Sequence, residues 1–177
     1  MTFNQIQKTM SVLETTRLIL RKFKPGDSEF IFKLLNSPGW LKYIGSRGIS
    51  GLEEAQKYIE TLLIPPYEKY GFGLYMMVRK DDGVCVGMCG LIKRDTMEDV
   101  DIGFAVLPEY EGNGYASEAA IATMDHADQL GLKKIVAITV EYNTGSIKIL
   151  EKLGMKFEKT IRLPDDPEDL MLYVKEL

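Results

Sequence analysis

Residues 100–120, VDIGFAVLPEYEGNGYASEAA, place a strand, a glycine turn and a helix in direct succession. The first backbone N–H groups of a helix have no partner within the helix, and they carry the positive end of its dipole. Gly112 and Gly114 let the backbone approach a ligand without a Cβ in the way, and Ala116 keeps the next position small. The segment therefore predicts a cradle for a phosphate or diphosphate group.

Three other interpretations of this turn compete with that one. A Walker phosphate loop needs Gly-Lys-Ser/Thr, which Asn113-Gly114-Tyr115 does not supply. A dinucleotide fingerprint over Gly112, Gly114 and Ser117 normally lies in the first βαβ unit, whereas this turn follows an antiparallel region well along the chain. A tight turn that binds no ligand is the plainest alternative, and the turn residues alone do not decide against it.

Hydrophobic patterns along the rest of the chain predict one mixed α/β domain. We expect strands at 15–23, 72–80, 84–92, 100–106, 135–140, 155–161 and 170–175. We expect helices after a capping Asp27 and over 52–63, 114–130 and 144–153, with a loop at 40–50. The fold class is thus α/β (α+β), a mixed, mostly antiparallel twisted sheet flanked by about four helices. Residues 14–177 form the domain, and 1–13 form an extension or a frayed strand.

Composition and charge exclude several classes of function. Among 177 residues there are 22 Lys and Arg against 26 Asp and Glu, a net charge of −4 with no basic block, so we expect no nucleic-acid partner. No run approaches the ~20 apolar residues of a membrane span, so we expect no membrane partner and a cytoplasmic location. Cys85 and Cys89 are expected as small buried residues on one strand face. No His or further Cys lies near enough to them to indicate a metal site.

The sequence around the turn favours one interpretation. Residues 111–116, EGNGYA, match the motif Gln/Arg-x-x-Gly-x-Gly/Ala except at the opening Glu111. Together with ETTRLILRKF (14–23), VDIGFAV (100–106), EYNTGSIKILEKLGM (141–155) and LMLYVKEL (170–177), this segment resembles, in the right order, the GNAT superfamily of N-acetyltransferases. The pattern over 108–119 is most similar to the RimJ/RimL-like branch, which acetylates protein N-termini. The resemblance spans residues 14–175.

The resemblance implies a place for acetyl-CoA, because in this family coenzyme A enters a V-shaped split between the strand before the motif and the strand after its helix. Carried over, the main chain of Phe104, Ala105 and Val106 pairs with pantetheine. The pyrophosphate is then held by Gly112, Asn113, Gly114, Tyr115, Ala116 and Ser117. Asn143 contacts the cofactor arm and Ser146 lies near the sulfur, although the sequence equally fits a helix N-cap at Asn143 and an ordinary first-turn residue at Ser146.

The resemblance also implies catalytic residues. A neutral amine must attack the thioester, and an α-amine with a pKa of ~8 needs less help than a Lys with a pKa of ~10.4. Asp101 is the first candidate for the general base, through a water, because it matches the acidic position of the family's Glu-x-Gly pattern and shares a strand face with Gly103. A solvated strand residue is the alternative. Asp165 is a second candidate, and the Val106 N–H is the expected oxyanion donor.

Two residues depart from the family pattern. Leu150 stands where many members have a Tyr as general acid, so either Ser146 protonates the leaving thiolate or the thiolate leaves unaided. Glu111 places an acid beside the diphosphate, so its side chain is expected to turn away from the phosphates.

The acceptor side is implied by the loop between the first two helices, which gives Trp40, Tyr43 and Arg47 as substrate-binding residues. Arg47 suits a carboxylate or a phosphate, with a surface position as the plainer alternative. The single histidine, His126, is expected at the surface. We expect a monomer or a homodimer.

The sequence thus predicts an acetyl-CoA-dependent N-acetyltransferase whose acceptor is a protein N-terminus or a small amine. No Ser-His or Cys-His pairing is evident, so direct attack is favoured over a covalent acyl-enzyme. A non-catalytic coenzyme A-binding module and a nicotinamide enzyme that uses Gly112 and Gly114 stay open as alternatives.

Overall fold

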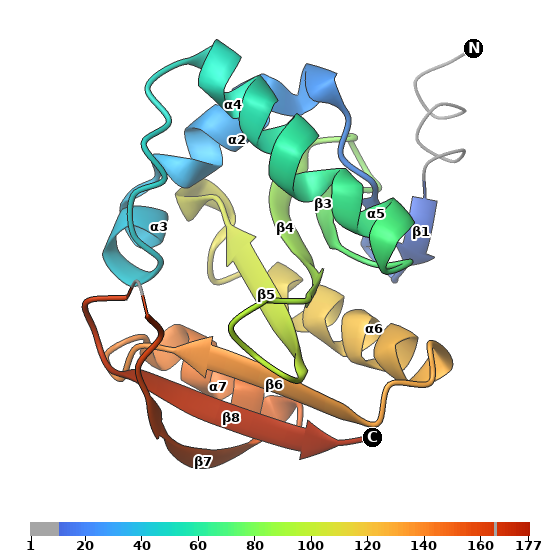
Figure 1. Cartoon of the computed structure of the whole chain (residues 1–177). Coiled ribbons are helices and arrows are strands. Elements are labelled where there is room, and N and C mark those ends of the chain that lie inside the picture. The colour runs from blue at the N-terminus through green and yellow to red at the C-terminus, as the bar shows by residue number, and fades with distance from the viewer. Residues whose placement is uncertain (1–10, 165) are drawn as a thin grey trace.

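The protein is described from a computed structural model that covers residues 11–164 and 166–177 (Figure 1). These residues form one mixed eight-stranded sheet in the order β1-β2-β3-β4-β5-β6-β8-β7. The strands are β1 (Ser11–Glu14), β2 (Leu18–Arg21), β3 (Leu74–Arg79), β4 (Cys85–Ile92), β5 (Val100–Val106), β6 (Lys134–Thr139), β7 (Lys156–Ile161) and β8 (Leu170–Glu176). Every neighbouring pair is antiparallel except β5 and β6, which are parallel. The predicted mixed, mostly antiparallel sheet is confirmed.

Helices cover both faces of this sheet. They are α2 (Ser28–Leu35), α3 (Pro38–Tyr43), α4 (Leu52–Tyr58), α5 (Pro65–Lys69), α6 (Tyr115–Gln129) and α7 (Thr144–Lys152), with short turns η1 (Pro25–Asp27) and η3 (Pro108–Tyr110) and a π-helical segment η2 (Ile59–Leu63). None of the helices in the described ranges is long and apolar enough to cross a membrane.

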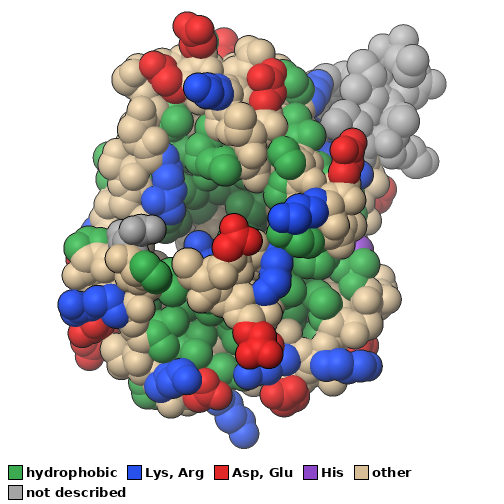
Figure 2. Space-filling model, in the orientation of Figure 1, with side chains coloured by type: hydrophobic (Ala, Val, Ile, Leu, Met, Phe, Trp, Pro, Cys, Tyr) green, Lys and Arg blue, Asp and Glu red, His purple; other side chains and the backbone are tan. Residues whose placement is uncertain are grey.

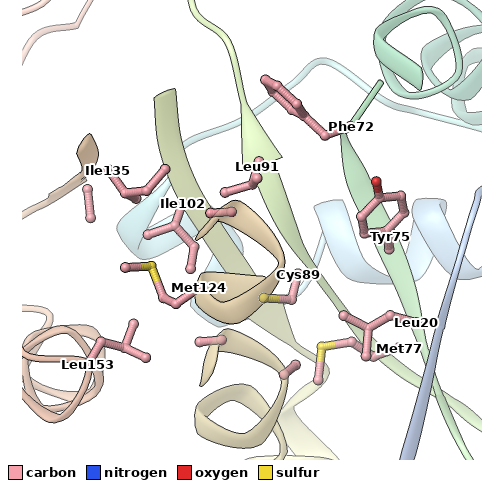
Figure 3. Packing of buried hydrophobic residues seen from close by; sticks show 14 of the residues in the cluster. Leu20, Phe72, Tyr75, Met77, Cys89, Leu91, Ile102, Met124, Ile135 and Leu153 are labelled. Atoms are coloured by element: carbon pink, nitrogen blue, oxygen red, sulfur yellow. The ribbon is translucent and has the colours of Figure 1, made fainter. Parts of the chain in front are cut away.

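The core consists of two clusters, one on each face of the sheet. Tyr75 and Met77 of β3 pack with Cys89 and α6, and Figure 3 shows this cluster from close by. Met76 and Val78, which point the other way, pack with α2 and α4. Successive strand residues point to opposite faces, so this apolar strand is buried on both sides. The central strands thus lie between two packed layers.

The split that positions the site lies between β5 and β6. These strands pair only at Val100 with Ile135 and at Asp101 with Val136. On its other side β5 stays paired with β4 as far as Val106. From residue 102 to 106, β5 therefore presents one backbone edge without a strand partner among the described residues. The splayed strand pair implied by the family resemblance is present.

Several local predictions are corrected by the structure. Residues 40–50 begin inside helix α3 instead of forming a loop, because Ser37 accepts a hydrogen bond from the Trp40 N–H at 3.4 Å and Pro38 fits the first helical turn. The helical segment predicted over 52–63 is present as α4 and η2, and Pro65 then begins the short helix α5, which was not predicted. The strand predicted over 15–23 is only Leu18–Arg21, and β1 precedes it as a separate strand.

Asp27 does not cap α2 through its side chain. Both carboxylate oxygens instead accept hydrogen bonds at 2.8 Å from the buried Arg21 guanidinium, and one also accepts from the Lys24 N–H at 2.9 Å. A buried arginine must be paired, so the ion pair takes the carboxylate that the helix end would otherwise use.

The two cysteines do not share a face. Met77 pairs with Gly87 and Val78 with Cys85, so Val86 is an extra residue in the ladder. Such a bulge reverses which side chains point to which face. As a result Cys89 lies in the cluster with α6, and Cys85 packs against the opposite cluster.

Candidate active site

A cavity of about 1090 Å³ follows the split in the sheet. Its wall includes the unpaired half of β5, the turn before α6, the start of α7, and residues of α3, η2 and α5. Figure 2 shows the molecule hollowed near the centre of this face, with apolar side chains inside the hollow. A site of this size can enclose a ligand much larger than a single amine.

The glycine turn forms one end of the cavity. Gly112 and Gly114 have φ values of +74° and +79°, the left-handed region that side chains rarely adopt. Five residues of the predicted cradle lie in the cavity wall: Gly112, Gly114, Tyr115, Ala116 and Ser117. Asn113 is outside this wall, and its side-chain amide donates to the Tyr110 and Glu111 carbonyls, each at 3.1 Å. The asparagine side chain therefore closes the turn on itself.

Ser117 provides a direct test of whether this turn fits a phosphate. Its Oγ is buried, lies in the first turn of α6, and has no hydrogen-bond partner among the described residues. Burying a hydroxyl without a partner is costly, so such a group inside a cavity indicates a ligand atom that completes it. Helix N–H groups and a hydroxyl donor together suit a phosphate oxygen. The residues present fit a diphosphate.

The β5 edge supplies backbone groups to the middle of the cavity. The Leu107 N–H donates to the Val86 carbonyl of the β4 side at 2.9 Å. Neighbouring N–H groups of a strand point in opposite directions, so the N–H of Val106 faces away from β4 and into the split. Phe104, Ala105 and Val106 all lie in the cavity wall.

Asn143 and Ser146 meet the cavity from α7. The Asn143 Oδ1 accepts a hydrogen bond from the Ser146 N–H at 3.1 Å, so the expected N-cap is present. Both residues also line the cavity, beside the buried Leu150. The N-cap fixes the start of α7 against the split.

Asp101 is the buried acid of the cavity. Its side chain is 2% exposed, and its Oδ2 accepts a hydrogen bond from Arg94 Nε at 2.7 Å. Its Oδ1 is buried with no partner in the part of the chain that the structure describes. Burial raises the pKa of Asp101 to about 6, against the opposing effects of the Arg94 charge and hydrogen bond and of the nearby Ile138 backbone. The alternative of a solvated strand residue is therefore wrong, and the carboxylate can exchange a proton near neutral pH.

Asp165, the second candidate base, lies outside the described residues. Its neighbour Asp166 lines the cavity. The loop that contains it is tied to the acceptor side, because Tyr142 Oη lies 2.7 Å from Glu168 Oε2 and 3.4 Å from the Lys42 carbonyl.

The three predicted acceptor residues all line the other end of the cavity. Trp40 and Tyr43 lie on α3, and Arg47 follows that helix. The Trp40 indole Nε1 is buried and has no partner within the described ranges. Burial raises the pKa of Tyr58, while the nearby Arg47 opposes this effect, so these two side chains lie close together.

Glu111 and His126 complete the predicted set. The Glu111 Oε1 lies against α3, 3.4 Å from the position that a Cβ on Gly39 would take. His126 is not a fully exposed surface residue: its Nε2 is buried, and its ring lies edge-on to Tyr75 with centroids 6.5 Å apart. It is not part of the cavity wall.

Sequence reasoning missed two residues that line this site. Arg94 precedes β5 in the turn from β4, and Tyr58 lies at the end of α4. Neither residue belongs to a motif, and each reaches the cavity only through tertiary packing. The positive charge of Arg94 could have indicated it, since a buried acid on β5 requires a cation nearby.

A split parallel strand pair with a diphosphate cradle at one end is the arrangement expected of an enzyme that uses a coenzyme A thioester. The family model for the acetyltransferase (GNAT) domain matches residues 17–156. YoaA of Bacillus subtilis (strain 168), an uncharacterised N-acetyltransferase, is 30% identical over 153 residues, which cover 85% of this chain and 86% of the relative.

Two solved structures share the fold. The acetyltransferase from Agrobacterium tumefaciens str. C58 has a TM-score of 0.77 and 27% identity, with 92% of each chain covered. RimL, a ribosomal L7/L12 α-N-protein acetyltransferase solved in complex with coenzyme A, has a TM-score of 0.70 and 16% identity, with 94% of this chain and 98% of that chain covered.

This chain belongs to the GNAT acetyltransferase family. The cofactor of that family is acetyl-CoA, and the turn before α6 and the split beside β5 fit it.

Proposed function

We propose that this chain is an acetyl-CoA-dependent N-acetyltransferase that acts on a primary amine by direct attack in a ternary complex. The observation that carries the proposal is a single cavity that joins the phosphate cradle, the splayed edge of β5 and the buried Asp101. Acetyl-CoA, when bound, supplies the acetyl group as a thioester. The remaining steps belong to residues of the chain.

The proposed cofactor contacts follow the cavity from one end to the middle. Gly112, Gly114 and Ser117 hold the diphosphate through N–H and hydroxyl donors. The backbone groups of Phe104 and Val106, which face the split, pair with the pantetheine amides as another strand would, whereas those of Ala105 face β4 and its side chain only lines the cavity. Asn143 and Ser146 border the pantetheine arm and the sulfur from α7, and Tyr115 and Ala116 shape the cradle.

Asp101 is the proposed general base, acting through a water. Its Oδ1 has no partner among the described residues, so that oxygen can accept a proton while Arg94 holds Oδ2. A pKa near 6 leaves the carboxylate largely ionised at neutral pH, as a base requires. The Val106 N–H, which faces the split, is the proposed hydrogen-bond donor to the oxyanion that forms as the amine attacks. Ser146 is the proposed donor of a proton to the leaving thiolate.

The proposed acceptor is a primary amine, on a protein N-terminus or a small molecule, that enters past Trp40, Tyr43 and Arg47. RimL, which shares the fold, acts on a protein N-terminus, and this favours an α-amine. An α-amine has a pKa of ~8, so a larger fraction of it is neutral than of a Lys side chain at ~10.4. Arg47 suits an acceptor that carries a carboxylate near the amine.

The test is acetyl transfer itself, compared between wild type and Asp101→Asn. Thiol release and product mass are measured with peptides that have free N-termini, with N-terminally blocked peptides that contain Lys, and with small amines. We expect transfer to an α-amine, and a fall in kcat of about 100-fold or more in the variant with coenzyme A binding retained.

The matched control for this test is Asp99→Asn. Asp99 directly precedes β5, is ion-paired with Lys134 at 2.9 Å and is outside the cavity wall, so its variant should keep full activity. Binding of acetyl-CoA without transfer to any amine would instead identify a non-catalytic coenzyme A-binding module.

A further inference from the structure

The turn between β1 and β2 is attached to the first turn of α6. Thr15 Oγ1 donates to Glu118 Oε1 at 2.6 Å, and the Arg17 N–H donates to the same oxygen at 2.8 Å. Arg17 Nε donates to the other oxygen, Oε2, at 2.7 Å. Three donors from one short segment thus hold a single carboxylate, across about a hundred residues of sequence.

The same Arg17 guanidinium also contacts the glycine turn. Its Nη1 donates to the Asn113 carbonyl at 3.0 Å, and its Cζ lies 4.6 Å from the centre of the Tyr115 ring. Its Nη2 is 3.4 Å from the position that a Cβ on Gly114 would occupy. One side chain therefore contacts three consecutive residues of the cradle.

Arg17 makes these contacts from outside the site. Neither Arg17 nor Asn113 is in the cavity wall, whereas Gly112 and Gly114 are. Two glycines in the left-handed region give this turn more conformational freedom than other residues would. A turn of this kind must be held from its outer side if its N–H groups are to stay fixed toward a ligand.

The charge of Glu118 gives its ion pair with Arg17 a second role. Glu118 lies in the first turn of α6, the same helix end that would bind the diphosphate. Burial raises the pKa of Glu118, but the hydrogen bonds from Thr15 and Arg17 lower it overall, so the carboxylate stays ionised. An unpaired anion there would repel a diphosphate, and the ion pair with Arg17 offsets that repulsion.

We propose that Arg17 is a positioning residue for the diphosphate of acetyl-CoA, which it serves by fixing residues 113–115 and by neutralising Glu118. The proposal rests on the proposed function. Arg17 does not touch the cofactor or the acceptor. A merely structural tie would affect all steps alike, whereas positioning affects only donors that carry a diphosphate.

The experiment compares two acetyl donors, acetyl-CoA and acetyl-pantetheine, which share the thioester and the pantetheine arm; the second lacks the 3′-phospho-ADP part that contains the diphosphate. For Arg17→Ala we expect the KM of acetyl-CoA to rise about tenfold or more, as for the loss of charge-assisted hydrogen bonds. The kcat, the KM of the amine and the kinetics with acetyl-pantetheine should change less than about twofold. Arg17→Lys keeps the charge without the planar fork and should give an intermediate value.

Lys134→Ala is the matched control, because it also removes a partly exposed ion pair, with Asp99, away from the cavity wall. The Lys134→Ala variant should leave the KM and kcat with either acetyl donor unchanged. An equal loss with both donors, or no loss with acetyl-CoA, would overturn the proposal. If Arg17→Ala does not fold, the same comparison with Arg17→Lys decides.

If the wild type transfers no acetyl group, the proposed function fails but the role of Arg17 is still tested by calorimetric binding of coenzyme A and pantetheine. A weaker affinity of Arg17→Ala for coenzyme A alone supports positioning, and an unchanged affinity contradicts it.

Discussion

At the residue scale, the chemistry of the cavity depends on the surroundings of Asp101. Burial raises the pKa of this carboxyl, and Arg94 limits the rise so that the group titrates at about 6. The sequence predicted that Asp101 shares a strand face with Gly103, because that follows from the strand period. It did not predict the burial or the Arg94 contact, since both depend on how the turn between β4 and β5 folds back over the strand.

The pH dependence of transfer should report this carboxyl. With a saturating acceptor of known amine pKa, kcat/KM for acetyl-CoA should fall about tenfold per pH unit below about 6, as Asp101 takes up a proton and can no longer act as base. Asp101→Asn should lose that limb of the profile while keeping its small residual rate. A wild-type profile that stays flat between pH 5 and pH 7 would contradict the assignment.

The raised pKa of Asp101 also predicts how the stability of the fold depends on pH. The pKa of Asp101 is raised from 3.8 to about 6 on folding, so between these values the native state binds more protons than the unfolded state. The cost of the buried charge is therefore absent below pH 4 and fully present above pH 6. At pH 8 the free energy of unfolding of Asp101→Asn should exceed that of wild type by up to about 3 kcal/mol, which is seen as a higher melting temperature. This difference should disappear near pH 4. Equal melting differences at both pH values would contradict this.

At the element scale, the site depends on β5 keeping its pairing with β4 while it parts from β6. The strand over 100–106 and the helix after it were predicted from periodicity, because a glycine turn separates two strong patterns. Helix α3 was missed because Ser37-Pro38 both ends one helix and begins the next. The bulge at Val86 was missed because nothing in an apolar run marks an extra residue.

Gly90 of β4 tests how closely this strand must approach the start of β3. A Cβ at Gly90 would lie 2.1 Å from the Gly73 carbonyl oxygen and 2.8 Å from the Leu74 Cα, both backbone atoms. Gly90→Ala should therefore destabilise the fold by about 2 kcal/mol or more, measured by thermal or urea unfolding. Gly26→Ala, where nothing lies within 4 Å of the added Cβ, is the control and should change stability by less than about 1 kcal/mol. Equal stability of the two variants would contradict this packing.

At the scale of the whole molecule, the cavity gathers residues from both ends of the chain. The cradle and the β5 edge are continuous in sequence, and this is why they were predictable. The contact between Arg17 and Glu118, and the approach of Arg47 to Tyr58, join segments that sequence patterns treat separately. Such contacts arise only when the sheet is assembled, so their partners could not be named from the sequence.

The proposed diphosphate site is tested most directly by thermal melting of wild type and Ser117→Ala with acetyl-CoA, coenzyme A, NAD or no ligand. Without ligand, Ser117→Ala should be at least as stable as wild type, because it removes a buried hydroxyl without a partner. Acetyl-CoA at about a hundred times its dissociation constant should stabilise wild type by ~2.7 kcal/mol, a shift of roughly 5–10 °C, and NAD should give none. The shift with acetyl-CoA should shrink in the variant. A shift with NAD but none with acetyl-CoA, or an acetyl-CoA shift that Ser117→Ala leaves intact, would contradict the proposed diphosphate site.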